Sequence, residues 1–213
     1  MKKFFLTIVL LSLAISSFAQ EKDVTKFLGI PVDGTKAEMI AKLKEKGFTS
    51  TVRDKDILEG EFNGRDVEIM IGTNRDKVWR IIVADKVFSN ESQIKTRFNN
   101  LCHQFDRNSN YYLLPLEQTI SEDDDISYEM TVHSKNYNAV FYQKSAFDDN
   151  SNIDIENILK NDTLTEKEKQ IKTLEFMNSA HKPVWFTIIE SQGEYLIAIY
   201  YENRLNQADG EDL

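Results

Sequence analysis

The stretch FLGIPVDGTKAEMIAKLKEKGF, residues 27–48, has the most regular pattern in the chain. Thr35 is followed three residues later by Glu38. This is the spacing of a capping box, in which each side chain accepts a hydrogen bond from the free backbone N–H of the other residue. An apolar stripe at helical spacing follows, at Met39, Ile40 and Leu43. Because Gly47 then supplies the left-handed residue that often ends a helix, the stretch predicts a helix over residues 36–46.

The loop before this helix contains Gly29 and Gly34, and glycine-rich loops that precede helices can bind phosphate. Such a loop needs several glycines, so that successive backbone N–H groups point at one anion. Here no Lys-Ser or Lys-Thr pair follows, and Pro31 has no backbone N–H. We therefore interpret the loop as a strand-like run and a turn that lead into Thr35, at the beginning of the folded domain.

The N-terminal residues MKKFFLTIVLLSLAISSFAQ have the order of a secretory signal. Lys2 and Lys3 precede an apolar run over residues 4–15, which ends in small residues before Ala19. The apolar run is too short to span a bilayer. We expect residues 1–19 to be a signal peptide, cleaved after Ala19, and the mature chain to be periplasmic or extracellular. Since no cysteine lies near that junction, lipid attachment is not expected.

The remaining chain is strongly acidic. Lys2 and Lys3 are the only charged residues in the signal, so its removal changes the formal net charge from −9 to −11. This charge argues against nucleic acids and anionic membrane surfaces as partners, because both attract clustered Lys and Arg. No other apolar run is long enough for a transmembrane segment. The single cysteine, Cys102, excludes an internal disulfide, and its place on an apolar helical face predicts a buried thiol.

Strand-like runs follow the first helix at residues 57–62, 66–71 and 78–84. The first two are separated by Asn63-Gly64, the pair best suited to a tight hairpin turn. A second helix is predicted to start near Ser89 or Asn90. Further strands are predicted at residues 126–132, 138–143, 184–190 and 194–201.

These runs predict an α+β fold with antiparallel meander sheets and helices on one face. Residues 20–88 would form one helix-plus-meander unit, and residues 89–205 a second unit with a helical insertion at 148–182. The acidic residues 206–213 are predicted to be a disordered tail. A diverged duplication of the two units stays open, since Val-Trp occurs in both, at Val78-Trp79 and Val184-Trp185.

Residues 27–48 resemble the N-terminal segment of small, uncharacterised secreted proteins of Gram-negative gut anaerobes. The resemblance covers about 22 residues of the 213 and implies no activity. The order of helix and meander is also similar to the modules of beta-lactamase inhibitory protein and of the small lipoprotein of the outer-membrane barrel-insertion machinery. This chain lacks the disulfides of the former and the lipid-attachment site of the latter. The second similarity is one of architecture alone.

The best metal-like pattern is the run DDNSNIDIE, with oxygen-bearing side chains at Asp148, Asn150, Asn152, Asp154 and Glu156. This alternation is typical of a calcium loop. However, Ile153 occupies the position where a glycine makes the sharp turn, and Leu159 the position of the closing carboxylate. A weak calcium site and a solvated loop before a helix both remain open, and no other cofactor is indicated.

All eight tyrosines lie in the second half of the chain. Tyrosine is enriched on recognition surfaces, because its ring is large and rigid and carries a polar tip. It also packs well across neighbouring strands. Both explanations stay open. The residues singled out as a candidate ligand-binding surface are Tyr128, Tyr142, Trp185, Tyr195 and Tyr200.

No catalytic motif is present: the sequence contains neither a Gly-x-Ser-x-Gly elbow nor a His-Glu-x-x-His pair. The sequence therefore favours an exported, non-enzymatic binding or interaction module, whose partner could be a protein or an envelope component. The alternative is a secreted hydrolase that acts on glycans or peptides through a pair of carboxylates. The sequence does not indicate an oligomeric state.

Overall fold

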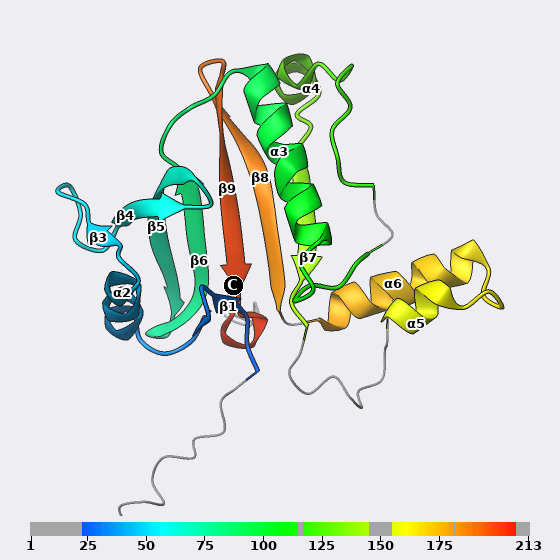
Figure 1. The fold of residues 1–213 in the computed structure, drawn as a ribbon, viewed down its shortest axis with the longest axis horizontal. Coiled ribbons are helices and arrows are strands. Elements are labelled where there is room, and N and C mark those ends of the chain that lie inside the picture. The colour runs from blue at the N-terminus through cyan, green and yellow to red at the C-terminus, as the bar shows by residue number, and fades with distance from the viewer. Residues whose placement is uncertain (1–22, 115–116, 145–154, 181, 208–213) are drawn as a thin grey trace, which may run out of the picture.

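A computed structural model describes residues 23–114, 117–144, 155–180 and 182–207 (Figure 1). The predicted signal peptide lies outside these ranges, and so does the predicted tail from residue 208. In the described part of the chain, no helix is long and apolar enough to cross a membrane.

Seven antiparallel strands form the main sheet, in the order β3-β4-β5-β6-β9-β8-β7. A separate two-stranded sheet precedes it, made of β1 and β2. The strands are β1 (Lys26–Phe27), β2 (Ile30–Pro31), β3 (Thr49–Ser50), β4 (Leu58–Phe62), β5 (Arg65–Asn74), β6 (Lys77–Asp85), β7 (Asn138–Tyr142), β8 (Pro183–Ser191) and β9 (Glu194–Glu202).

The helices are α2 (Lys36–Glu45), α3 (Glu91–Asp106), α4 (Ile126–Val132), α5 (Ile155–Lys160) and α6 (Glu166–Ser179), with a short 3-10 helix, η1 (Arg204–Asn206), after β9. The α+β class is therefore confirmed. The predicted boundary between the second unit and the tail falls inside η1, whose Asn206 is buried and donates hydrogen bonds to Asp33 and to the carbonyl of Val78.

The opening stretch folds as its sequence predicts. The Thr35 N–H donates to the Glu38 carboxylate at 2.9 Å, and the Glu38 N–H donates to the Thr35 hydroxyl at 3.3 Å. Both bonds of the capping box are present, and α2 ends one residue earlier than expected, with Lys46 as its C-cap. Met39 and Leu43 are buried, so the apolar stripe faces the core.

The first meander is also confirmed. Asn63 and Gly64 both have positive φ angles, of 52° and 70°, and they join β4 to β5 as a two-residue turn. This conformation is the one that right-twisted hairpins require, and the Asn-Gly pair adopts it with little steric cost. Strand β6 then returns alongside β5, with a β-bulge opposite Gly72 and Thr73.

Residues 126–132 were predicted to be a strand, and this prediction is wrong because they form helix α4. The Asp125 carboxylate caps the helix by accepting the Tyr128 N–H at 2.8 Å. Ile126 and Met130 pack toward the core, whereas Tyr128 and Val132 are exposed. An apolar residue at every second position contains an i, i+4 pair, so the pattern suits both a strand and a short helix.

One face of the sheet carries the core. Ile69, Val83, Ile199 and Phe186 lie side by side across β5, β6, β9 and β8, and all four are buried. Helix α3 packs on this face over the second half of the sheet, and α2 packs over the first half (Figure 1). The antiparallel sheet therefore packs one apolar face against α2 and α3, as is common for this class.

The opposite face is only partly covered. Its central row, Met70, Ile82, Tyr200 and Trp185, is half-buried. At the β7 edge, α5 and α6 form a second, smaller cluster around Tyr142, Ile155 and Phe176. Because Tyr142 follows the buried core residue Phe141 on β7, its side chain points to the opposite face, and the α5–α6 pair packs there.

The two halves contribute the same order of elements to the sheet: α2 with β4, β5 and β6, and α3 with β7, β8 and β9. Strands β6 and β9 meet at the centre, so the order is symmetric about their junction. The repeated Val-Trp pair does not follow this symmetry, because Trp79 lies on β6 and Trp185 on β8. The strand order is therefore symmetric, the repeated dipeptide is not part of that symmetry, and a duplication stays a prediction.

The N-terminal segment ties both halves together. The Lys182 ammonium lies 2.7 Å from the Asp23 carboxylate, and the Thr25 hydroxyl donates to the carbonyl of Glu202. The Gln143 side chain bonds both the N–H and the carbonyl of Lys26, at 2.8 Å each. The first described residues are thereby fixed against β7, β8 and β9 at the end of the sheet (Figure 1).

A buried ion pair holds α3 on the sheet. Arg97, from α3, donates through Nε and Nη2 to the two carboxylate oxygens of Asp85 at the end of β6, at 3.1 and 3.0 Å. Both side chains are less than one-tenth exposed, at 8% and 7%. The pair neutralises both buried charges and links α3 to β6, the last strand of the first half of the chain.

We expect Asp85→Ala to lower the free energy of unfolding by about 3–5 kcal/mol, because it leaves the Arg97 charge buried without its partner. Chemical denaturation would measure the change. The control is Glu68→Ala, which removes a pair with the largely exposed Arg53 and should cost below about 1 kcal/mol. Equal losses for the two variants would show that the Asp85–Arg97 pair does not anchor α3.

Candidate functional site

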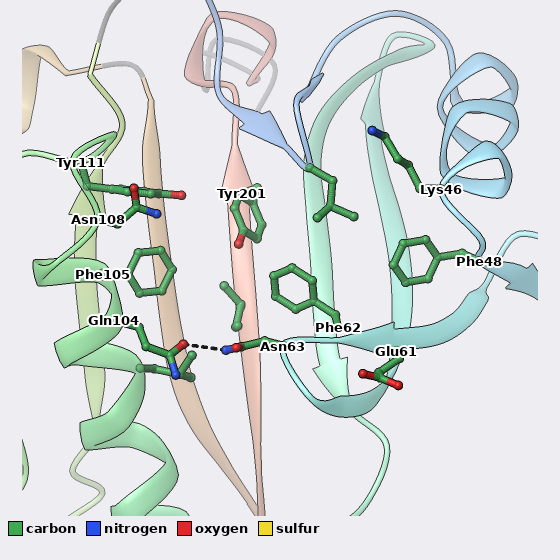
Figure 2. A pocket seen from close by; sticks show the side chains of 13 residues that line it. Lys46, Phe48, Glu61, Phe62, Asn63, Gln104, Phe105, Asn108, Tyr111 and Tyr201 are labelled. Atoms are coloured by element: carbon green, nitrogen blue, oxygen red, sulfur yellow. Dashed lines mark hydrogen bonds between the residues drawn. The ribbon is translucent and has the colours of Figure 1, made fainter.

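A cavity of about 570 Å³ opens between α3 and the first half of the fold, on the core face of the sheet (Figure 2). Its volume lies in the range of small-molecule sites, which are about 300–1,000 Å³. Its floor is β9, where Ile199 and Tyr201 alternate with residues of the opposite face. The cavity therefore lies above the junction of the two halves.

Helix α3 forms one wall. Leu101, Gln104 and Phe105 line the cavity at positions i, i+3 and i+4, the spacing of one helical face, and Asn108 lines it just after the helix has ended at Asp106. Leu101 and Phe105 are buried, and the two amides stand at the rim. The Phe105 ring is stacked on Phe141 of β7, with ring centroids 4.6 Å apart, and this contact fixes the apolar part of the wall.

The opposite wall comes from the first half of the chain. Phe62 lies at the end of β4, and Phe48 follows α2. Phe48 lies so close to the strand that a Cβ atom at Gly60 would be 2.6 Å from its ring, so only glycine allows this approach. Phe27 packs behind the cavity, with ring centroids 5.2 Å from Phe62 and 4.8 Å from Tyr201.

The turn between β1 and β2 lies at the rim of the cavity. It consists of Leu28 and Gly29, with φ angles of 50° and 79°. A leucine with positive φ is uncommon, and strained residues of this kind cluster at functional sites. Leu28 lines the cavity and is 40% exposed. The loop of the opening stretch thus contributes to the candidate site through an apolar side chain.

A polar bridge and two charges complete the rim. The Asn63 side-chain amide donates to Gln104 at 2.8 Å, which links the β4–β5 turn to α3 across one end of the cavity (Figure 2). Lys46 and Glu61 stand on the side of the first half, and both are exposed. Glu61 is the only carboxylate among the described residues that line the cavity.

Two tyrosines lie in the buried part of the cavity. Tyr201 is 5% exposed, and its hydroxyl has no hydrogen-bond partner among the described residues. Figure 2 shows this hydroxyl directed toward the space between Phe62 and Phe105. Tyr111 packs edge-on against Phe105, and its hydroxyl accepts a hydrogen bond from Gln143 at 3.0 Å. The buried part of the cavity is therefore mainly apolar, with phenolic groups in it, whereas the charged and amide side chains of the lining are exposed.

Burial keeps both phenols protonated. Desolvation raises the pKa of Tyr201 well above its ordinary value, and the neighbouring Tyr111 raises it further. Desolvation also raises the pKa of Tyr111, although the hydrogen bond from Gln143 opposes this effect. Both hydroxyls are thus hydrogen-bond donors, and neither is an anion, at neutral pH.

The structure separates the five aromatic residues that the sequence singled out. Trp185 and Tyr200 meet on the opposite face of the sheet, stacked with ring centroids 3.9 Å apart. Tyr195 is buried in the core, and its hydroxyl donates to Ser127 at 2.8 Å. Tyr142 is buried against α6, and Tyr128 is exposed on α4. Only Trp185 and Tyr200 share a surface.

That stacked pair belongs to a cluster around Arg80. The bulge in β6 leaves Trp79 without a direct partner on β5, and the Arg80 guanidinium lies 4.0 Å from the centre of its ring. The Glu202 carboxylate accepts hydrogen bonds from Arg80 and, at 2.9 Å, from Trp185 Nε1. Glu202 thus pairs with Arg80 and Trp185, whereas Arg80 Nε is buried and has no hydrogen-bond partner among the described residues.

The candidate calcium loop cannot be placed. Asp148, Asn150, Asn152 and Asp154 lie outside the described residues, and the side chain of Glu156 is not described either. Among the residues that are described, no group of three or more His, Cys, Asp or Glu side chains is placed to hold a metal ion. Calcium binding therefore stays a prediction.

Cys102 matches its prediction as a core thiol. It is 1% exposed, and its Sγ lies 3.8 Å from the carbonyl of Gln118. Desolvation, reinforced by the negative charge of Asp106, raises the pKa of the thiol to about 12. Because the thiolate is the reactive form, this group is chemically inert at neutral pH.

No family model, curated protein or solved structure matches the chain. The resemblance of residues 27–48 to secreted proteins of gut anaerobes therefore stays a prediction. The function of the cavity has to be inferred from the chemistry of its own residues.

We expect Tyr201 to ionise well above pH 10, because burial disfavours its phenolate. In the unfolded chain the same group ionises near pH 10, so the stability it contributes is present below about pH 10 and is lost as the pH rises further. Phenolate absorbance during a pH titration would measure this. Tyr201→Phe should remove one tyrosine from the last phase of the titration and make stability fall less steeply at alkaline pH. If Tyr201→Phe instead removed a tyrosine that ionises in the first phase of the titration, near pH 10, the buried position of Tyr201 would be contradicted.

Proposed function

We propose that this chain is a non-enzymatic binding module that holds a small, largely apolar molecule in the cavity between α3 and β4. The observation that carries the proposal is the Tyr201 hydroxyl, which faces the cavity from a buried ring and has no hydrogen-bond partner among the described residues. The described side-chain atoms that are fully buried without a partner do not include this hydroxyl, so it is open to the cavity. A ligand that fills the cavity would displace water from the hydroxyl and would have to offer an acceptor in its place.

The composition of the walls supports binding. Phe48, Phe62 and Phe105 give the cavity aromatic walls, and a few polar groups stand where they can orient a ligand. Small-molecule sites combine the same two elements, an apolar surface for affinity and convergent polar groups for orientation. The apolar surface is also preformed, since the Phe105 ring is stacked on Phe141.

The hydrolase alternative gains less support from this cavity. A glycosidase needs two carboxylates on either side of the reacting bond, and Glu61 is the only acid that lines the described cavity. Glu91 and Glu122 both line a separate groove beside α3, where Glu91 already accepts the N–H of Ile126 at 3.0 Å. Because Glu91 already holds the beginning of α4, it is a weaker candidate for a catalytic acid, and binding is the better-supported function.

Recognition of a protein or an envelope component is a second candidate. Tyr200 and Trp185, with Met70 and Ile82 in the same row, give the opposite face of the sheet a half-buried, mostly apolar centre. The predicted signal peptide would bring either surface into contact with envelope components or external molecules. The two candidates use opposite faces of β9, so substitutions on that strand can separate them.

The test is binding of an uncharged apolar dye, N-phenyl-1-naphthylamine, to the full mature chain. We expect saturable binding that Gln104→Trp weakens by at least about tenfold, because the indole would occupy the rim of the cavity. Fluorescence and calorimetric titrations would measure the affinity.

The matched control is His103→Trp, the neighbouring exposed residue of α3, which does not line this cavity. It should bind the dye as the unmodified protein does. Tyr200→Ala reports on the opposite face. Equal affinities in the Gln104 and His103 variants, or a loss only with Tyr200→Ala, would show that the cavity is not the binding site.

A further inference from the structure

The hydrogen-bonding state of Tyr111 can be derived from the backbone. The Gln143 side-chain oxygen accepts the Lys26 N–H, and its NH₂ group donates to the Lys26 carbonyl, each at 2.8 Å. These two backbone groups have fixed polarity, so the orientation of the amide is determined. The NH₂ group must therefore also face Tyr111, at 3.0 Å. Tyr111 accepts this bond, and its own proton is left to donate elsewhere.

Tyr201 supplies a second donor nearby. Its ring lies on β9 beside the Phe105 wall, and Figure 2 shows the Tyr111 hydroxyl extending toward β9 from the α3 side. The two phenols are close enough for Tyr111 to disfavour ionisation of Tyr201 and raise its pKa. The Tyr111 and Tyr201 hydroxyls are both protonated, so two O–H donors converge on the buried end of the cavity. No residue of the described lining accepts a hydrogen bond from Tyr201.

The charges around the cavity indicate what kind of acceptor fits. Lys46 and Glu61, the charged residues among the described lining, are both exposed and belong to the rim. The buried residues of the described lining are two tyrosines and apolar side chains, with no charged group among them. An ionised carboxylate or phosphate placed there would lose its hydration without gaining a counter-ion, which is costly. A neutral oxygen loses far less.

We propose, on the basis of the binding function proposed above, that the cavity recognises an uncharged carbonyl oxygen, of a ketone, ester or amide, attached to a ring or other compact apolar group. Tyr201 and Tyr111 donate hydrogen bonds to the oxygen. Phe62 and Phe105 contact the apolar group, as aromatic side chains do when they pack against rings. Gln104 and Asn108 stand at the rim, where they meet any polar extension of the ligand.

The test uses three probes of similar size: acetophenone, which has a neutral carbonyl; ethylbenzene, which has no acceptor; and benzoate, which is ionised. Affinities would be measured by NMR titration of the full mature chain. We expect Tyr201→Phe and Tyr111→Phe each to weaken acetophenone binding about threefold to tenfold, the usual worth of one hydrogen bond, and to leave ethylbenzene binding unchanged.

Tyr200→Phe is the matched control, because it removes the hydroxyl of the adjacent residue, which faces the other side of the sheet. This variant should bind all three probes as the unmodified protein does. Each Tyr→Phe change removes only an oxygen, and the circular dichroism spectrum would confirm that the fold is retained.

The outcomes separate this inference from the binding function itself. If neither N-phenyl-1-naphthylamine nor any of the three probes binds, the binding function fails. If the dye binds and acetophenone does not, or if acetophenone and ethylbenzene respond equally to Tyr201→Phe, recognition of a carbonyl is refuted while the binding module stands. Tightest binding of benzoate, lost in Lys46→Ala, would show that the cavity selects an anion instead.

Discussion

The pairing of β6 with β9 is the constraint on which the rest of the structure depends. Five residue pairs, from Arg80–Glu202 to Ala84–Ala198, join strands that lie more than a hundred residues apart in the chain. Without this ladder the two meanders would be separate sheets, each with an unpaired edge. The ladder also determines where the helices lie, because α2 and α3 pack on opposite sides of it. The cavity is the space that they leave between them.

Because side chains alternate along β9, its C-terminal end presents different residues to the two faces of the sheet. Tyr200 points to the partly covered face and stacks on Trp185, whereas Tyr201 points to the core face and lines the cavity. A one-residue change of register would exchange them. The pair of Arg80 with Glu202 lies on the same ladder, and Asp85 at the other end of β6 holds α3. A few residues of two strands therefore position both surfaces and the helix between them.

Local signals predicted most of the fold, because capping boxes and Asn-Gly turns depend on a few neighbouring residues. Helix α4 was mistaken for a strand since an apolar residue at every second position fits both. The cavity was not predictable, as its walls come from residues 28 to 201. Tyr201 was missed in favour of Tyr200 for a related reason: the run EYLIAIYY is apolar on both faces, so alternation does not show which face is the core. Tyr111 gave no local signal at all.

The contacts of Asp23, Thr25 and Lys26 also bear on the timing of folding. Their partners are Lys182, Glu202 and Gln143, so the first described residues are fixed by residues that are synthesised 117 to 177 positions later. Such long-range contacts slow folding, because the chain loses the entropy of loop closure before the stabilising contacts form. The native sheet cannot close while the chain is still emerging from the ribosome. The complete sheet therefore forms only after β8 and β9 have been made, however early the first meander folds.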